Sequence, residues 1–422
     1  MDTALYNDCV SILKEELLPA MGCTEPIAVA YAAAVARKTL GALPEKTDIC
    51  VSGNIIKNVK SVIVPNTNGL KGLAAATAAG IVAGDPEAEL QVISRVTPRQ
   101  VQEIAEYLEK AQFLVRRSDS GHIFDIGITV FGGGHSAFCR IVGNHTNIVS
   151  IKKDGTALME KDCAQAEGGH ATDRDILTVE RIVEFADCVA IDDVRELIGR
   201  QIEYNMAIAE EGLKTGYGAK IGRTLIAAYG NSVWVRAKAM AAAGSDARMN
   251  GCELPVVINS GSGNQGITAS VPVIVYGREL GVSEELLYRA LVVSNLITIH
   301  LKSGIGSLSA YCGATSAGCG AGAGITYLFG GKSNEIAHTV VNAVAINSGM
   351  ICDGAKASCA AKIASAVEAG LLGMQMYLHG NEFNGGDGIV TTGVENTINN
   401  VGKLARDGMS QTDQEIISLM IQ

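Results

Sequence analysis

The chain has 422 residues, of which 47% are hydrophobic, 18% are charged and only 5% are aromatic. This composition supplies enough apolar surface for two or three folded domains and excludes an intrinsically disordered protein. The formal net charge of −10, without any dense run of Lys or Arg, argues against a nucleic acid as a partner.

The cellular location can be predicted from the first residues and from the cysteines. Residues 1–8 have neither a basic segment nor an apolar one, so we expect no signal peptide. No run of about 18 apolar residues occurs, so we expect no membrane-spanning helix. The 11 cysteines are odd in number and scattered, which favours reduced thiols in the cytoplasm over a disulfide framework.

The first 45 residues are predicted to form two helices. An apolar residue recurs every four positions over 4–18, which indicates a helix that Pro19 ends. Pro26 suits the first position of a second helix, which runs to about Leu40. We expect residues 1–45 to pack on a larger helical domain further along the chain.

From residue 46 the periodicity changes from helical to alternating, which predicts an α+β domain over 46–170. The expected helices cover 71–82 and 98–110. The expected strands cover 47–52, 61–64, 91–93, 111–117, 123–131 and 136–142, and three consecutive glycines at 132–134 join the last two.

Residues 171–422 return to a helical pattern that is rich in Ala and Gly. Several of these helices lack a strongly charged face, which is typical of helices inside a bundle. The sequence therefore predicts a mainly α protein, with a large Ala/Gly-rich helical domain and a smaller inserted α+β domain.

Three cysteines near the C-terminus are candidate metal ligands. Cys312, Cys352 and Cys359 all lie among small residues, which leave space around the sulfur atoms. Three thiolates are one fewer than usually hold a [4Fe–4S] cluster, so one iron would stay open to a substrate. The alternative is that each is a small apolar core residue. Spacing alone does not decide, because Cys319 falls on the same helical face as Cys312.

Cys23 belongs to a second motif, Gly-Cys-Thr-Glu-Pro over 22–26, just before the predicted second helix. The positive end of the helix dipole should stabilise its thiolate, and Glu25 should oppose that effect. The alternative is a helix cap with an incidental cysteine.

A third motif is a polar loop with several glycines over 259–266, which exposes backbone N–H groups suited to an anion or a carboxylate. It has no Lys of the P-loop type, so a nucleotide site is weakly supported. The alternative is a flexible connection. The side chains expected to contact a substrate are Ser260, Ser262, Asn264 and Gln265.

Together these motifs resemble the L-cysteine desulfidase family, which is related to the alpha domain of bacterial iron–sulfur L-serine dehydratases. The resemblance covers nearly the whole chain, and its most specific parts are the segments over 22–26 and 260–266. It implies that Cys312, Cys352 and Cys359 hold a [4Fe–4S] cluster and that Cys23 is the catalytic base. It leaves Cys319 without a role.

The implied activity is β-elimination from L-cysteine, giving hydrogen sulfide, ammonia and pyruvate without pyridoxal phosphate. The open iron would act as a Lewis acid, and a thiolate with a pKa close to neutral would take the Cα proton. Two alternatives stay open: a dehydratase-type deaminase acting on L-serine, and a non-catalytic iron–sulfur or sulfur-sensing protein. The expected partner is a small amino acid, and the sequence leaves a homo-oligomer open.

Overall fold

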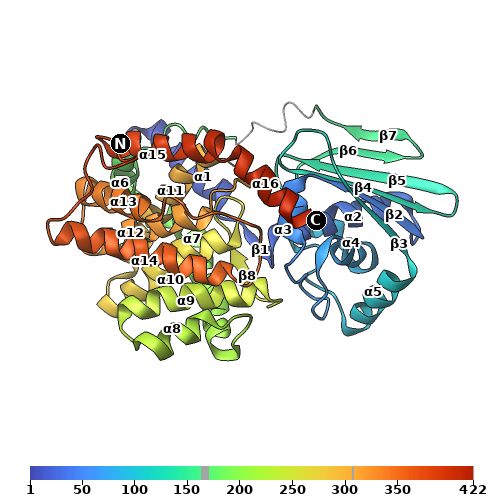
Figure 1. Ribbon diagram of the computed structural model, residues 1–422, viewed down its shortest axis with the longest axis horizontal. Helices are drawn as coiled ribbons and strands as arrows, with labels where there is room; N and C mark the ends of the chain where they lie inside the picture. Colours follow the sequence, from blue (N-terminus) through green and yellow to red (C-terminus); the bar gives the residue numbers. More distant parts are fainter. Residues whose placement is uncertain (163–170, 307, 422) are drawn as a thin grey trace.

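Among the described residues, two large hydrophobic cores organise the chain, one inside a body of helices and one against a six-stranded sheet (Figure 1). The computed structural model describes residues 1–162, 171–306 and 308–421. The mainly α fold with a smaller α+β part, expected from the sequence, is confirmed.

The helical body packs around α12, whose residues 314–328 are all buried. Its helices are α1 (Thr3–Glu16), α6 (Val179–Cys188), α7 (Ile191–Thr215), α8 (Ile221–Tyr229), α9 (Val233–Met249), α10 (Gly263–Leu280), α11 (Glu284–Ile305), α12 (Gly313–Leu328), α13 (Ser333–Asn347), α14 (Cys359–Leu378) and α15 (Val394–Lys403). A short two-stranded sheet joins β1 (Pro19–Met21) to β8 (Pro255–Val257). A π-helical turn (Leu404–Gly408) follows α15.

Helices α12 and α14 cross closely because glycines face each other at the crossing. A Cβ atom built on Gly318 would lie 2.2 Å from the carbonyl oxygen of Ala366. One built on Gly370 would lie 2.2 Å from the carbonyl oxygen of Gly318. The Ala/Gly-rich composition of this region therefore allows backbones to approach without intervening side chains.

The smaller part is a mixed sheet in the order β3-β2-β4-β5-β6-β7, in which only the β2–β3 pair is parallel. Its strands are β2 (Lys46–Val51), β3 (Gln112–Arg117), β4 (Asp125–Gly132), β5 (His135–Val142), β6 (Ile148–Lys153) and β7 (Thr156–Glu160). Helix α2 (Thr24–Leu40) packs on β4 and β5, and α4 (Gly72–Ala83) packs on α2. Alternate residues of β5, such as Cys139 and Ile141, point into this core. The other helices here are α3 (Gly53–Val59), a 3₁₀ helix (Pro86–Gln91) and α5 (Pro98–Lys110).

Two of the expected strands are wrong. Residues 61–64 form a turn with one isolated bridge from Ile63 to Lys71, because Asn66 and Asn68 adopt positive φ and reverse the chain. Gln91 ends the 3₁₀ helix, after a kink at Glu89, and residues 92–93 continue as a turn. The sequence reading also missed β1, β6, β7, β8 and α3.

The two N-terminal helices pack differently from each other. Helix α1 joins the helical core as expected, whereas α2 contributes its apolar residues to the core of the sheet. The expectation that both pack on the helical body is therefore wrong for α2, because its small, apolar face covers the inner side of β4 and β5. The proposed domain limits near 45 and 170 stay predictions.

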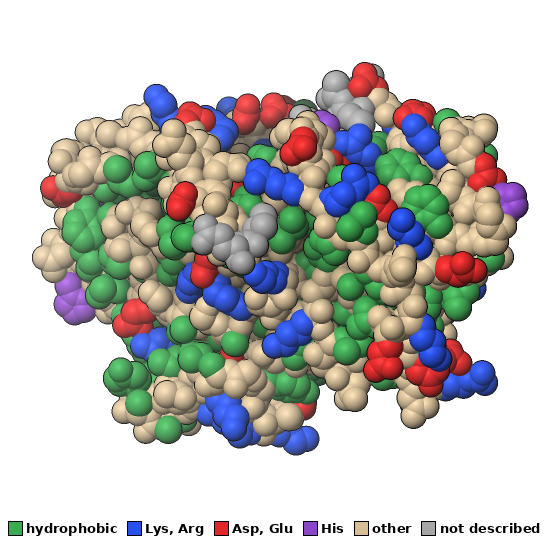
Figure 2. Space-filling view, turned by 45° about the vertical axis from the view of Figure 1, so that its right-hand side comes forward, with side chains coloured by type: hydrophobic (Ala, Val, Ile, Leu, Met, Phe, Trp, Pro, Cys, Tyr) green, Lys and Arg blue, Asp and Glu red, His purple; other side chains and the backbone are tan. Residues whose placement is uncertain are grey.

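The C-terminal helix α16 (Ser410–Ile421) returns to the smaller part and packs against α3 (Figure 1). Lys57 of α3 and Asp413 of α16 form a buried ion pair of 2.5 Å. Acidic and basic side chains are interspersed over the face drawn in Figure 2. None of the described helices combines the length and apolar character needed to cross a membrane.

Candidate active site

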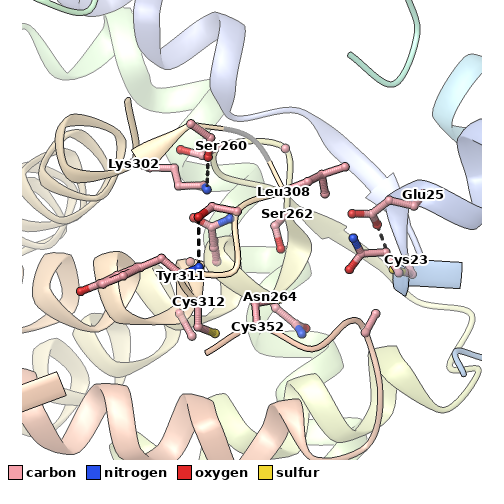
Figure 3. A pocket seen from close by; sticks show the side chains of 18 of the residues that line it. Cys23, Glu25, Ser260, Ser262, Asn264, Lys302, Leu308, Tyr311, Cys312 and Cys352 are labelled. Atoms are coloured by element: carbon pink, nitrogen blue, oxygen red, sulfur yellow. Dashed lines mark hydrogen bonds between the residues drawn. The ribbon is translucent and has the colours of Figure 1, made fainter. Parts of the chain in front are cut away.

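A cavity of about 280 Å³ lies between the helical body and the smaller part, and all eight residues predicted from the sequence line it. They are Cys23, Ser260, Ser262, Asn264, Gln265, Cys312, Cys352 and Cys359. In Figure 3, Cys312 and Cys352 lie on one side of the cavity and Cys23 and Glu25 on the other, with Ser262 and Asn264 between them. The fold thus brings together segments more than 300 residues apart.

Cys312 and Cys352 are brought together by a short backbone bridge between the residues that precede them, Tyr311 and Ile351. The Cys352 N–H donates to the carbonyl of Ala310 at 2.6 Å, which fixes the register. The two thiols share a hydrogen bond that lowers the pKa of Cys352 to about 6 and, with burial, raises that of Cys312. The Lys57 ammonium group also favours the Cys352 thiolate.

Cys359 is the first residue of α14, and its Sγ lies 3.7 Å from the carbonyl oxygen of Gly354. Its pKa is raised, because burial outweighs the backbone N–H groups at the helix start. Among the described residues, no set of three His, Cys, Asp or Glu side chains is arranged to hold a single metal ion.

Cys319 lies inside α12, is 1% exposed and is absent from the described lining of the cavity. Burial raises its pKa to about 12, so the thiol stays neutral. The structure thus separates Cys319 from the other three cysteines, which sequence spacing did not.

Cys23 stands at the N-cap of α2, where the sequence placed it, but its pKa is raised and not lowered. Burial is the largest cause, and the nearby Glu25 carboxylate adds to it. Its Sγ donates a hydrogen bond of 3.1 Å to Oε2 of Glu25, and Arg248 only partly offsets the shift. The expected pKa near neutral is therefore wrong, since burial and Glu25 outweigh the helix dipole.

The polar loop over 259–266 forms the start of α10, which begins at Gly263. Ser260 adopts a positive φ and its hydroxyl donates to Asn259 at 2.9 Å, so this side chain also holds the loop. The buried side-chain oxygens Oδ1 of Asn264 and Oε1 of Gln265 accept no hydrogen bond from any described residue. Buried polar atoms are normally paired, so these two oxygens point to a ligand that completes them.

Four helices, α2, α10, α12 and α14, begin at the wall of this cavity. Their N-cap residues are Cys23, Ser262, Cys312 and Ser358, and none of these side chains caps its helix in the described structure. Uncapped helix starts present free N–H groups and positive dipole ends. The cavity is therefore electrostatically suited to anionic groups.

Sequence reasoning missed several lining residues, among them His145, Arg248 and Lys302. Burial lowers the pKa of His145, which favours the neutral ring, and lowers that of Lys302 to about 8. The Lys302 ammonium group donates to the carbonyl of Gly306. Their roles depend on burial after folding, so no local motif in the sequence marks them.

Residues 87–418 match the family model described as serine dehydratase alpha chain. The chain belongs to the serine dehydratase alpha-chain family. The region that matches the family model includes Cys312, Cys352, Cys359 and the polar loop, whereas Cys23 lies before that region.

Relatives of this family member match over nearly their whole lengths. A UPF0597 protein of Desulfitobacterium hafniense (strain Y51) is 60% identical over 99% of this chain and 97% of its own. UPF0597 proteins of Lachnoclostridium phytofermentans and Treponema denticola are 48% and 46% identical, with coverage of at least 99% of each chain. The family match indicates a lyase-type enzyme.

Proposed function

We propose that this protein is a pyridoxal-phosphate-independent lyase that catalyses β-elimination from L-cysteine, giving hydrogen sulfide, ammonia and pyruvate. The observation that carries the proposal is the meeting of Cys312, Cys352 and Cys359 with Cys23 in one cavity of amino-acid size. The free cysteines of the described chain fit the reducing environment of the cytoplasm.

The donor set fits a [4Fe–4S] cluster held by Cys312, Cys352 and Cys359. Cluster ligands are thiolates, and Cys352 already has a pKa of about 6 beside Lys57 and Lys362. The starts of α12 and α14 add positive dipole ends at Cys312 and Cys359. When bound through three thiolates, such a cluster supplies one open Lewis-acidic iron that favours departure of the substrate sulfur.

The residues opposite these thiols provide a route for the substrate proton. β-Elimination breaks the Cα–H and Cβ–S bonds, so a base accepts the proton as sulfur leaves as hydrosulfide. Cys23 is that base: Glu25, 3.1 Å from its Sγ, first takes the thiol proton, and the thiolate formed then accepts the Cα proton. Ser262, Asn264 and Gln265 bind the substrate between the two sides, and the aminoacrylate released then hydrolyses to ammonia and pyruvate.

L-Serine is the second candidate substrate, because the matching family model is described as serine dehydratase alpha chain. The same cavity would then release hydroxide in place of hydrosulfide. The thiol side of the cavity favours L-cysteine in our proposal, since a soft open iron prefers a sulfur ligand to an alcohol oxygen.

One experiment separates these functions. Protein reconstituted with iron and sulfide under anaerobic conditions is given L-cysteine or L-serine, and sulfide, ammonia and pyruvate are measured. We expect all three products from L-cysteine, at a higher kcat/KM than the deamination of L-serine. Higher efficiency with L-serine would make the protein a dehydratase. Failure with both, by protein that retains its iron, would favour a non-catalytic iron–sulfur or sensing role.

A further inference from the structure

Arg248, at the end of α9, is a buried arginine for which the described part of the chain supplies no partner. Its side chain lines the cavity and the residue is 2% exposed. Within the described residues, no hydrogen bond or ion pair is found for its guanidinium group, and its Nε is buried without a partner. Arg174, a second buried arginine of the wall, instead pairs with Glu15 and Glu16.

A buried, unpaired guanidinium group carries a large desolvation cost, so its position calls for an anion supplied from outside the chain. The carboxylate of Glu25 is an acidic group of the cavity wall whose charge acts on the same neighbours as Arg248, namely Cys23 and His145. The Glu25 carboxylate instead accepts hydrogen bonds from Cys23 and Thr24, and no ion pair joins it to Arg248 in the described structure. His145 is held neutral by burial and does not compete for an anion.

The surroundings of Arg248 suit a carboxylate. A Cβ built on Gly263, the first residue of α10, would lie 2.3 Å from the Arg248 Nε, so the guanidinium group packs directly on this helix start. The uncapped N–H groups of α10 and the planar guanidinium fork therefore present their donors in the same region. In the described chain, no acidic side chain forms an ion pair with the Arg248 guanidinium group.

The distance to the thiol side is spanned by a single side chain. Gln265, two residues into α10, packs on Gly313, where a Cβ would lie 2.6 Å from the Gln265 Cδ. Gly313 directly follows Cys312. The anion-binding end and the thiol end of the cavity are thus linked by one glutamine side chain, which matches a small molecule with a carboxylate at one end and a thiol at the other.

We infer that Arg248 binds the α-carboxylate of the amino-acid substrate and is a specificity-determining residue of the site. The inference rests on the proposed function for the identity of the substrate. The chemical class of the ligand, a small carboxylate that carries a thiol, is inferred from the cavity wall and does not depend on the proposed function. A substrate bound in this way has its β-sulfur directed to the thiol end and its Cα beside Cys23.

The test measures binding, and uses two probes that each carry a thiol but differ in the carboxylate. Anaerobic, cluster-loaded protein is titrated with 3-mercaptopropionate and with cysteamine, and dissociation constants are obtained by calorimetry. In Arg248→Met we expect about 10- to 100-fold weaker binding of 3-mercaptopropionate, the usual range for a lost charge-assisted contact, and no change for cysteamine. Arg248→Lys should recover part of the loss, because it keeps the charge without the planar fork.

Arg236→Met is the matched control, since Arg236 lies on the same helix but pairs with Glu279 at the surface, and it should leave both constants unchanged. Three results would overturn the inference: equal weakening of both probes, failure of the unaltered protein to bind 3-mercaptopropionate, or loss of iron from Arg248→Met, which would mean that Arg248 balances the cluster charge. If binding of 3-mercaptopropionate depends on Arg248 but the protein releases no sulfide from L-cysteine, the proposed function alone would be refuted. If the protein releases sulfide from L-cysteine but Arg248→Met still prefers 3-mercaptopropionate to cysteamine as strongly as the unaltered protein does, this inference alone would be refuted.

Discussion

The thiol of Cys23 donates a 3.1 Å hydrogen bond to the carboxylate of Glu25, two residues further along at the start of α2. This contact gives the thiol a proton acceptor inside the cavity wall. It also raises the pKa of Cys23, because a thiolate there would face a carboxylate in a buried setting. A thiolate with a raised pKa is a strong base, and the Glu25 carboxylate is in place to accept the proton that Cys23 must first lose.

Replacing Cys23 by Ala should abolish turnover while leaving the iron in place. Loss of a general base usually slows a reaction by about 10²- to 10⁴-fold, and Cys23→Ser should be nearly as slow because an alcohol ionises far less readily. Sulfide release and iron content per chain are the measurements. Cys139→Ala, a buried cysteine of the sheet core, is the control and should stay active. Loss of iron from Cys23→Ala would instead make Cys23 a cluster ligand.

Each of the variants Cys312→Ser, Cys352→Ser and Cys359→Ser should lose the cluster. Their visible absorption and their iron and sulfide content after reconstitution report this. Cys319→Ser should retain the cluster, because that side chain is buried in α12 away from the cavity. Bleaching of Cys319→Ser alone would show that the wrong ligands were chosen.

Asp413→Ala should destabilise the protein by about 3–5 kcal/mol, since it leaves the Lys57 ammonium group buried without its partner. Lys57 also favours the Cys352 thiolate, so its freed side chain should alter iron loading as well. Urea unfolding and iron content measure the two effects. Exposed Glu415, on the same helix, provides the control, and equal stability of Glu415→Ala and Asp413→Ala would contradict the prediction.

Gly318→Ala should cost about 1–3 kcal/mol, the usual range for overpacking. Its Cβ would lie 2.2 Å from a backbone carbonyl of α14, which outweighs the gain of up to about 1 kcal/mol from higher helix propensity. Gly304→Ala in α11, whose nearest neighbour would lie at 3.5 Å, should be neutral or stabilising. Thermal unfolding compares the two variants, and a stabilised Gly318→Ala would refute the close crossing.

Asp246→Asn should gain stability relative to the unaltered protein as pH rises from 5 to 8. Burial raises the pKa of Asp246 to about 6, so ionisation is costlier in the folded chain than in the unfolded one. The native contribution of this group is therefore present at low pH and is lost as pH rises through about 6. We expect the difference in unfolding free energy to change by about 1 kcal/mol over this interval. A constant difference would contradict the raised pKa.

The sequence predicted those elements whose signals are local. Helix α5 begins and ends as expected, because Thr97 caps it, Pro98 starts it and one face is apolar. Residues 61–64 have the composition of a strand but form a turn, since the backbone of Asn66 reverses the chain before any partner strand is reached.

In the candidate site too, local sequence signals could be predicted and effects of packing could not. The position of Cys23 at a helix start could be predicted, because Pro26 marks that start. The pKa of Cys23 could not, since burial decides its sign. Arg248 and Lys302 carry no motif at all, and only the packing of separate helices places them in the cavity wall.

The ion pair between Lys57 and Asp413 joins residues 356 positions apart. A ribosome makes Lys57 long before Asp413, so Lys57 lacks this partner while the intervening residues are being made. Contacts of such long range also slow the final folding step. A chain cut before α16 would leave Lys57 without its partner beside Cys352, and under the proposed function we expect it to load less iron than the unaltered protein.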